Sequence, residues 1–290
     1  MIVGFIVAVV FFALFIAAEN RSPAPLLRLD LFQNRAFAVN SIITVVGMFA
    51  FLGTAYSTSI RLSAIQGFSP MQTAVAFVLL QGFALALMPL TAKVIQEYNP
   101  RWALGGGFAL IAIGDLWIAT QSASDLSLWP VVAPLVLIGV GFAFALSGVT
   151  AVAVNTVPNH LAGMASGTTS QLRDLGFTLG PAVIGAIALS RAAAEIQSKL
   201  AASPSLQSAL NAFSAKAPPE VVGAVHSGPL GANAIPGNPL KDVAFAALDN
   251  AYSVGFVVCG IAALVAAVLA AGALHGTAHR PLVTEESLHD

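Results

Sequence analysis

The sequence predicts an all-α integral membrane protein with seven transmembrane helices. Hydrophobic residues make up 57% of the 290 residues and charged residues only 9%, and the mean hydropathy is +0.85. A soluble chain usually carries about a quarter of charged residues. Repeated apolar runs of about 20 residues, each long enough to cross a bilayer, account for the deficit.

The seven expected helices follow from where the apolar runs begin and end. Residues 1–18 lack the positive flank and the clear cleavage site of a signal peptide, so we expect a membrane span there. Residues 19–36 are polar and contain proline, and we expect them to lie at the cytoplasmic membrane surface with their arginines toward the headgroups. The next five helices are expected over about 37–60, 72–91, 102–120, 129–154 and 157–189, so that they occupy residues 37–189.

The segments between the helices are expected to be short, with one exception. We expect a turn-rich loop over residues 61–70, a tight polar connection over 93–101 and a large extracytoplasmic insertion over 190–250. Residues 191–213 can prolong the preceding helix, Pro218 and Pro219 break it, and residues 228–239 are expected to be loop from their Gly and Pro content. A second short helix is expected over 241–250, the last membrane helix over 251–274 and a polar cytoplasmic tail over 275–290.

Basic residues in the short loops set the expected orientation. The loops after the first, third and fifth helices, together with the tail, contain six basic residues: Arg21, Arg28, Arg35, Lys93, Arg101 and Arg280. The short loops on the opposite side contain only Arg61. We therefore expect a multi-pass protein of the cell (inner) membrane with its N-terminus outside and its C-terminus in the cytoplasm.

The helix that begins near Val157 combines small residues with polar ones, in the sequence VPNHLAGMASGTTSQLRDLGFTLGPAVIG. Gly176 and Gly180 let neighbouring helices approach closely. Gln171, Arg173 and Asp174 lie at a depth where ionisable groups are costly unless they face a bundle interior or a wet cavity. These three residues are therefore candidates for a substrate cavity or gate.

Arg173 has two interpretations. At 1.5 Å per residue it lies about 15 Å from the expected cytoplasmic end of its helix. It either serves as a cavity or gate residue or forms a structural ion pair at the inner mouth of the bundle. Asp174 is about 100° away around the helix, so we do not expect it to be the partner of Arg173.

Polar side chains in the other helices are further candidates. Asn40, Thr54, Tyr56 and Gln81 either line a cavity or form hydrogen bonds between helices. Asp115 is a candidate proton carrier. Its position near the outer surface and the neighbouring Trp117, however, favour a snorkelling or locally hydrated carboxylate.

Several other functions find no support in the sequence. It contains no HExxH zinc helix, Walker A loop, nucleophile elbow or closely spaced acid pair, so we expect neither an enzyme nor a cofactor. His275 and His279 share a helical spacing but lack a third ligand, and we expect a solvated tail rather than a metal site. Cys259 is the only cysteine, which excludes an intrachain disulfide. The net charge of −1 and the lack of a basic patch argue against a nucleic-acid partner.

The order of three motifs resembles the major facilitator superfamily. LDLFQNRAFAVN leads into the second helix, QGFSPMQTAVA into the third and VPNHLAGMASGTTSQLRDLGFTLG into the sixth. The sequence is similar in particular to the fourteen-span drug:proton antiporters of the EmrB/QacA type, which also have a long insertion before the last helix. The resemblance corresponds to the C-terminal half of such a transporter. It implies a C-terminal six-helix bundle preceded by one extra helix, residues 1–18.

The resemblance implies that this chain is half of a proton-coupled multidrug efflux antiporter. Its expected partners are the lipid bilayer, a small amphipathic or cationic substrate and protons. The six-helix bundle is expected to consist of two inverted three-helix repeats. The family's Gly-x-Leu-Ala-Asp-Arg-x-Gly-Arg loop is replaced by AKVIQEYNP over residues 92–100, which weakens the case for a gating role of this loop.

A transporter of this type needs two halves that rock around a central site. We therefore expect the chain to be incomplete on its own, as a fragment, a split subunit or a truncated frame, and to act with a separate N-terminal bundle. The alternative is a non-transporting membrane scaffold or orphan subunit that docks on another helical bundle.

Overall fold

The structure, a computed structural model, describes residues 10–11, 14, 29–125 and 127–274, and most of these residues are helical. Five helices in these ranges are long and apolar enough to cross a membrane, and a bent helix pair raises the number to six. The predicted all-α membrane fold is confirmed. The first predicted helix, the arginine-rich segment before Leu29 and the tail with its two histidines lie wholly or largely outside the described residues.

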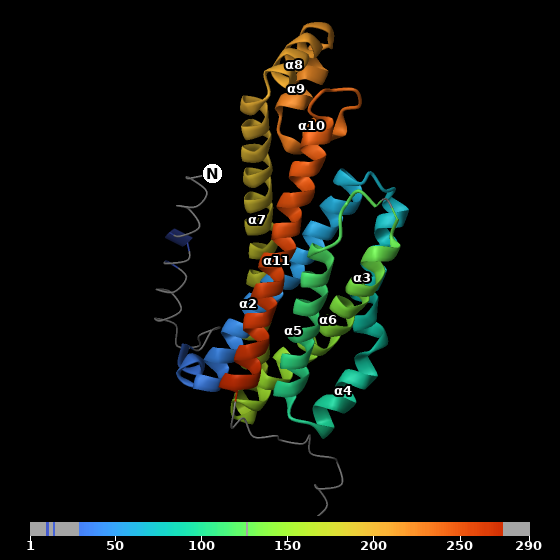
Figure 1. Ribbon diagram of the computed structural model, residues 1–290. Helices are drawn as coiled ribbons and strands as arrows, with labels where there is room; N and C mark the ends of the chain where they lie inside the picture. Colours follow the sequence, from blue (N-terminus) through green and yellow to red (C-terminus); the bar gives the residue numbers. More distant parts are fainter. Residues whose placement is uncertain (1–9, 12–13, 15–28, 126, 275–290) are drawn as a thin grey trace, which may run out of the picture.

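The helices follow the predicted order along the chain (Figure 1). They are η1 (Leu29–Gln33), α2 (Arg35–Ser59), the π-helix η2 (Ile60–Ile65), α3 (Pro70–Ala86), α4 (Met88–Glu97), α5 (Pro100–Ala119), α6 (Trp129–Asn155), η3 (Asn159–Leu161), α7 (Ala162–Ala202), α8 (Pro204–Lys216), α9 (Pro219–His226), α10 (Pro229–Ala234) and α11 (Lys241–Ala273).

The starts of these helices are determined by local sequence. Asn34 caps α2, because its Oδ1 accepts a hydrogen bond from the backbone N–H of Ala36 at 2.9 Å. Ser69 and Gln72 form a reciprocal capping box at the start of α3. Proline occupies the first turn of α3, α4, α5 and α6. Proline is well tolerated there, because the N–H groups of the first turn have no partner within the helix.

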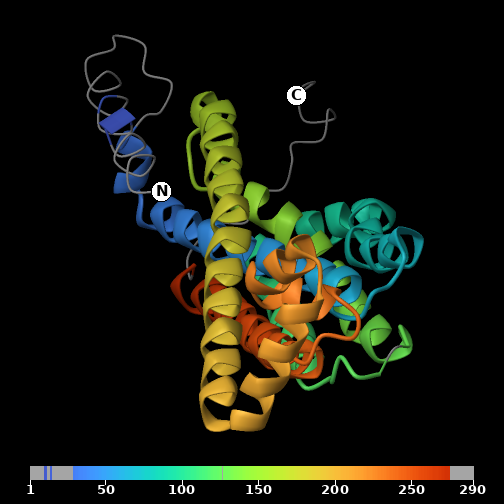
Figure 2. The same ribbon diagram turned by 90° about the horizontal axis from the view of Figure 1, so that it is seen from above.

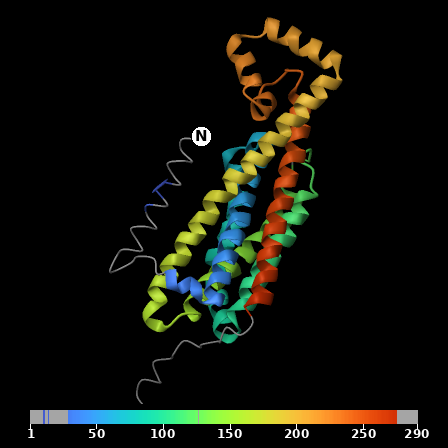
Figure 3. The ribbon, with the colours of Figure 1, turned by 90° about the vertical axis from the view of Figure 1, so that its left-hand side faces the viewer.

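The long helices stand side by side in one bundle (Figures 1 and 3). The helix contacts come in matching pairs if α2 is equated with α6, α3 with α7 and α5 with α11. The helix α2 packs against α7 and α11, just as α6 packs against α3 and α5, and α5 and α11 pack against each other. Two inverted repeats, one running from α2 to α5 and the other from α6 to α11, would produce this pattern of neighbours.

Glycines set the closest approaches between helices. A Cβ atom on Gly107 of α5 would lie 2.6 Å from the carbonyl oxygen of Gly141 on α6. A Cβ atom on Gly180 of α7 would lie 2.6 Å from the carbonyl oxygen of Phe49 on α2, and one on Gly176 would meet α2 equally closely. The predicted packing role of Gly176 and Gly180 is therefore confirmed.

The structure corrects several predicted boundaries. The third membrane helix bends by 48° between α3 and α4, where Pro89 occupies the first turn of α4. The predicted connection over 93–101 is largely helical, since α4 continues to Glu97. Residues 60–65 form a π-helix instead of a turn, and part of the predicted loop over 228–239 is α10. The predicted prolongation of α7 is confirmed as far as Ala202, but it ends before Pro204 instead of at Pro218 and Pro219, and α8 follows. The short helix predicted over 241–250 is the first part of α11, which begins at Lys241.

The insertion between α7 and α11 folds onto one end of the bundle, which we call the insertion end (Figures 1 and 2). Alanines and leucines of α7 and α11 form an apolar core there with Val225 of α9 and Ala232 of α10. Asn233 of α10 donates a hydrogen bond to the carbonyl oxygen of Ala64 in η2 at 2.8 Å. The insertion is therefore attached to the bundle through both apolar and polar contacts.

Candidate functional site

The helix α7 places the predicted cavity residues at the edge of the bundle. Gln171, Asp174 and Thr178 are exposed and, at spacings of three and four residues, share one face of the helix. In the apolar 18-residue stretch of α7 that is long enough to cross a membrane, only 28% of the residues are buried, against 56% in the corresponding stretches of α2, α5 and α6. This face, on which the exposed Leu175 also lies, is therefore uncovered by the part of the chain that the structure describes.

Arg173 lies beside this face and forms an ion pair with its sequence neighbour. Its Nε is 3.7 Å from Oδ1 of Asp174, with 30% of the arginine side chain and 63% of the aspartate side chain exposed. The expectation that Asp174 would not be the partner was wrong, because the long arginine side chain spans the angle between the two positions. The contact is long and exposed, so it holds Arg173 only weakly.

Thr54 of α2 and Asp115 of α5 meet inside the bundle. The distance from Thr54 Oγ1 to Asp115 Oδ1 is 2.7 Å, and both residues are completely buried. The interpretation of Asp115 as a snorkelling or hydrated carboxylate is wrong for this structure. Its helix does have an exposed face, but that face carries Leu116 and Trp117, while Asp115 faces α2 and α11.

The remaining predicted residues are distributed over the bundle. Asn40 donates a hydrogen bond from Nδ2 to the carbonyl oxygen of Val149 on α6 at 3.1 Å, as the interhelical alternative predicted. The ring of Tyr56 is 6.3 Å from that of Tyr252 on α11. Gln81 is exposed on α3. None of the described hydrogen bonds or ion pairs joins these side chains to α7, so the candidates do not form one compact site.

A buried cation lies outside the set of predicted site residues. Arg61, expected in a loop, lies in η2 with 2% exposure. Its guanidinium donates to the carbonyl oxygens of Ile118 at 3.3 Å and Gln121 at 2.5 Å, at the end of α5. In the loop that follows α5, the backbone N–H of Ala123 donates a hydrogen bond to Asp249 of α11 at 3.1 Å. Only the position of Arg61, directly after a long apolar run, hints at this role in the sequence.

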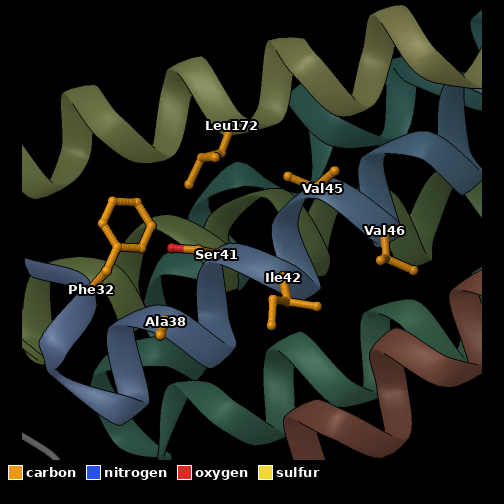
Figure 4. Close-up of a pocket in the computed structure, with 7 residues that line it drawn as sticks. All are labelled: Phe32, Ala38, Ser41, Ile42, Val45, Val46 and Leu172. Carbon is orange, nitrogen blue, oxygen red and sulfur yellow. The ribbon is translucent and has the colours of Figure 1, made fainter. Parts of the chain in front are cut away.

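An open apolar hollow of about 420 Å³ lies between α2, α7 and η1. In Figure 4, Leu172 of α7 reaches toward α2, and Phe32 borders the other end of the hollow. Among the described residues that line it, Ser41 has the one polar side chain, and its hydroxyl donates to the carbonyl oxygen of Phe37 at 2.8 Å. These described residues thus offer apolar contact without a charged group. Among the described residues, no group of three or more His, Cys, Asp or Glu side chains is placed to hold a metal ion.

Comparison with known proteins identifies the family. The family model of the Major Facilitator Superfamily matches residues 1–181. The chain is 33% identical to the uncharacterized MFS-type transporter Rv1250 of Mycobacterium tuberculosis, over 64% of this chain and 32% of that protein. It is 30% identical to the tetracenomycin C resistance and export protein of Streptomyces glaucescens, over 92% of this chain and 49% of that protein. It is also 28% identical to the multidrug efflux pump LfrA of Mycolicibacterium smegmatis, over 63% of this chain and 36% of that protein.

These relatives are longer than the chain, which spans about a third to a half of their length. The family model, in contrast, covers more than half of the chain itself. Together with the bundle of apolar helices, this match shows that the chain belongs to the major facilitator superfamily, a family of membrane transporters and not of enzymes.

Proposed function

We propose that this chain forms the C-terminal half of a proton-coupled drug efflux antiporter. In this proposal, small amphipathic or cationic molecules bind between its bundle and a second six-helix bundle. The order of its motifs supports the assignment to the C-terminal half. The alignment of 92% of the chain to about half of a resistance and export protein supports a transporter about twice as long as this chain, with export as the direction of transport.

The observation that carries this proposal is the uncovered polar face of α7. Gln171, Asp174 and Thr178 are exposed within a helix that is apolar enough to cross a membrane. Polar and charged side chains at such a depth are costly in lipid and usually face a bundle interior or a water-filled cavity. A second bundle across from α7 would supply that environment, and rocking of the two bundles would expose the cavity to either side in turn.

The charged pair on α7 suggests how a cation is received. Asp174 offers a carboxylate that is 63% exposed, and Arg173 contacts it only at 3.7 Å. A cationic substrate can bind at this carboxylate. Tyr56 and Gln81 are further candidates for the cavity wall.

We further propose that the protein lies in the cell (inner) membrane, with the insertion end outside and the C-terminal end of α11 in the cytoplasm. The distribution of basic residues in the short loops supports this orientation.

The test of the proposed function compares two arginines on one helix. The chain is produced together with an N-terminal bundle in a pump-deficient host, and efflux of several cationic dyes is measured. Arg173→Ala should reduce efflux several-fold without changing the amount of chain in the membrane. Arg191→Ala, an exposed position 18 residues further along α7, should leave efflux unchanged.

Equal efflux in the two variants would contradict the role of the α7 face. If the two bundles reach the membrane and associate but move no dye, the non-transporting scaffold or subunit becomes the better interpretation.

A further inference from the structure

Asp115 lies at a junction of three helices. Its side chain is completely buried, and its Oδ1 is 2.7 Å from the Thr54 hydroxyl of α2. The helix α11 closes the third side, since a Cβ atom on Gly260 would lie only 3.2 Å from the Cβ of Asp115. The other carboxyl oxygen, Oδ2, is buried and has no hydrogen-bond partner among the described residues.

No cation from the surrounding helices faces this carboxyl group. Neither α2 between residues 36 and 59 nor α11 between residues 250 and 273 contains Asp, Glu, Lys, Arg or His, and α6 contains none at all. The titratable side chain that faces the junction from α11 is the thiol of Cys259, which also packs against Gly53. Arg61 lies nearer the insertion end and donates to the carbonyl oxygens of Ile118 and Gln121. None of the ion pairs in the described part of the chain includes Asp115.

The hydrogen atoms at the junction can be counted. The Thr54 hydroxyl oxygen lies 2.9 Å from the carbonyl oxygen of Ala50 and 2.7 Å from Asp115 Oδ1. A hydroxyl group has one hydrogen to donate, and both a backbone carbonyl and an ionised carboxylate can only accept. Both short contacts are full hydrogen bonds only if Asp115 carries a proton and donates it to Thr54, while Thr54 donates to Ala50.

The burial of the group leads to the same state. An ionised carboxylate that is buried without a cation is far more costly than a neutral carboxylic acid, which carries no net charge. An unpaired Oδ2 is correspondingly easier to accommodate on the neutral acid.

We infer that Asp115 holds a proton in this conformation and is a proton-binding site of the bundle, formed with Thr54 at the contact of α2, α5 and α11. Its role in antiport rests on the proposed function, whereas the presence of the proton does not. Release transfers the proton from the carboxyl group to water that enters the junction. Thr54 then turns its hydrogen from Ala50 to the newly formed carboxylate. Proton release thereby breaks a hydrogen bond within α2 and requires the three helices to admit water.

The test reads the protonation of Asp115 directly. The full chain is reconstituted in lipid at neutral pH, and infrared difference spectra are recorded for wild type against Asp115→Asn. The account predicts a C=O stretching band of a protonated carboxyl group that is lost in Asp115→Asn. In Thr54→Val the band should remain but shift, because the acid loses its hydrogen-bond partner. Asp174→Asn is the control, and this exposed aspartate should leave the band unchanged.

The infrared result and the efflux result can fail independently of each other. A carboxylate signal in place of the acid band would overturn the inference, as would a band that is unaffected by both Asp115→Asn and Thr54→Val. Asn matches the shape of the neutral acid, so a folded Asp115→Asn protein is expected, and the spectrum of Thr54→Val provides a second measurement on an intact carboxyl group. An acid band in a chain that supports no efflux with any N-terminal bundle would reject the proposed function but confirm the proton site.

Discussion

The glycine run at the start of α5 provides a test of the fold with its own control. Gly106 and Gly107 are neighbours in sequence but face opposite environments. A Cβ atom on Gly107 would lie 2.6 Å from the carbonyl oxygen of Gly141 and from the backbone nitrogen of Ala145, whereas a Cβ atom on Gly106 would have no neighbour within 4 Å. The same substitution, Gly to Ala, therefore probes the contact of α5 with α6 at one position and spares it at the other.

The expected magnitude follows from the distance. A separation of 2.6 Å is about 1 Å shorter than the ordinary contact distance of about 3.5 Å, and both opposing atoms belong to the backbone of α6. The helices must therefore move apart, and overpacking of this kind costs about 1–3 kcal/mol. Gly106→Ala introduces no clash and gains up to about 1 kcal/mol of helix propensity.

The assay is thermal unfolding of the purified chain in detergent, followed by the loss of monodisperse protein. For domains of 150–250 residues, each kcal/mol shifts the midpoint by roughly 2–4 °C, so Gly107→Ala should unfold several degrees below Gly106→Ala. Gly141→Ala should repeat the loss, because its Cβ atom would meet the carbonyl oxygen of Gly107. Equal midpoints for the two neighbouring glycine variants would refute the packing of α5 on α6.

Three further predictions follow from other contacts. Gly180→Ala should lower the unfolding midpoint by several degrees, because its Cβ atom would lie 2.6 Å from the α2 backbone, whereas Gly163→Ala on the same helix should not; the reverse order would contradict the α2–α7 contact. Arg61→Met should destabilise the chain by about 1–3 kcal/mol in the same assay, since it removes both donors to the end of α5; an unchanged midpoint would argue against this role. A reporter fused after Ala217, between α8 and α9, should be extracytoplasmic, and a cytoplasmic signal would reverse the proposed orientation.

The membrane helices were predictable because apolar run length decides whether a segment can cross a bilayer. The six runs from residue 37 onward correspond to the observed helices, with the second of these six divided into α3 and α4. The limits of α7 and α11 were harder to predict. Hydropathy falls where a helix leaves the bilayer, but the backbone continues as helix until a breaker such as Pro204.

The π-helix at Ile60–Ile65 depends on contacts that no local pattern contains. Arg61 is held there by carbonyl groups that lie 57 and 60 residues further along the chain. Likewise, Asn233 reaches η2 from 169 residues away. Interactions over such separations are set by helix packing, so the turn signals in the local sequence could not reveal them.

The candidate site was predictable in its residues but not in its pairings. Thr54 and Asp115 were both identified, yet a single sequence does not specify the register between α2 and α5. The burial of Asp115 could have been read from the helical period, since Phe108, Ile111 and Ala112 precede it by one or two turns on the same face and are buried. The partner of the α7 face could not be deduced from this chain, because no described element covers that face.

The central claim, that this bundle transports only together with a second one, is tested most directly by efflux from cells that contain the chain alone. The chain is expressed in a pump-deficient host, its presence in the membrane is verified, and the export of several cationic dyes is measured with and without a proton gradient. The account predicts no efflux above that of the empty host, and proton-dependent efflux when an N-terminal bundle is supplied. Robust proton-dependent efflux from the lone chain would contradict the claim and would indicate that two copies of this bundle form a working transporter.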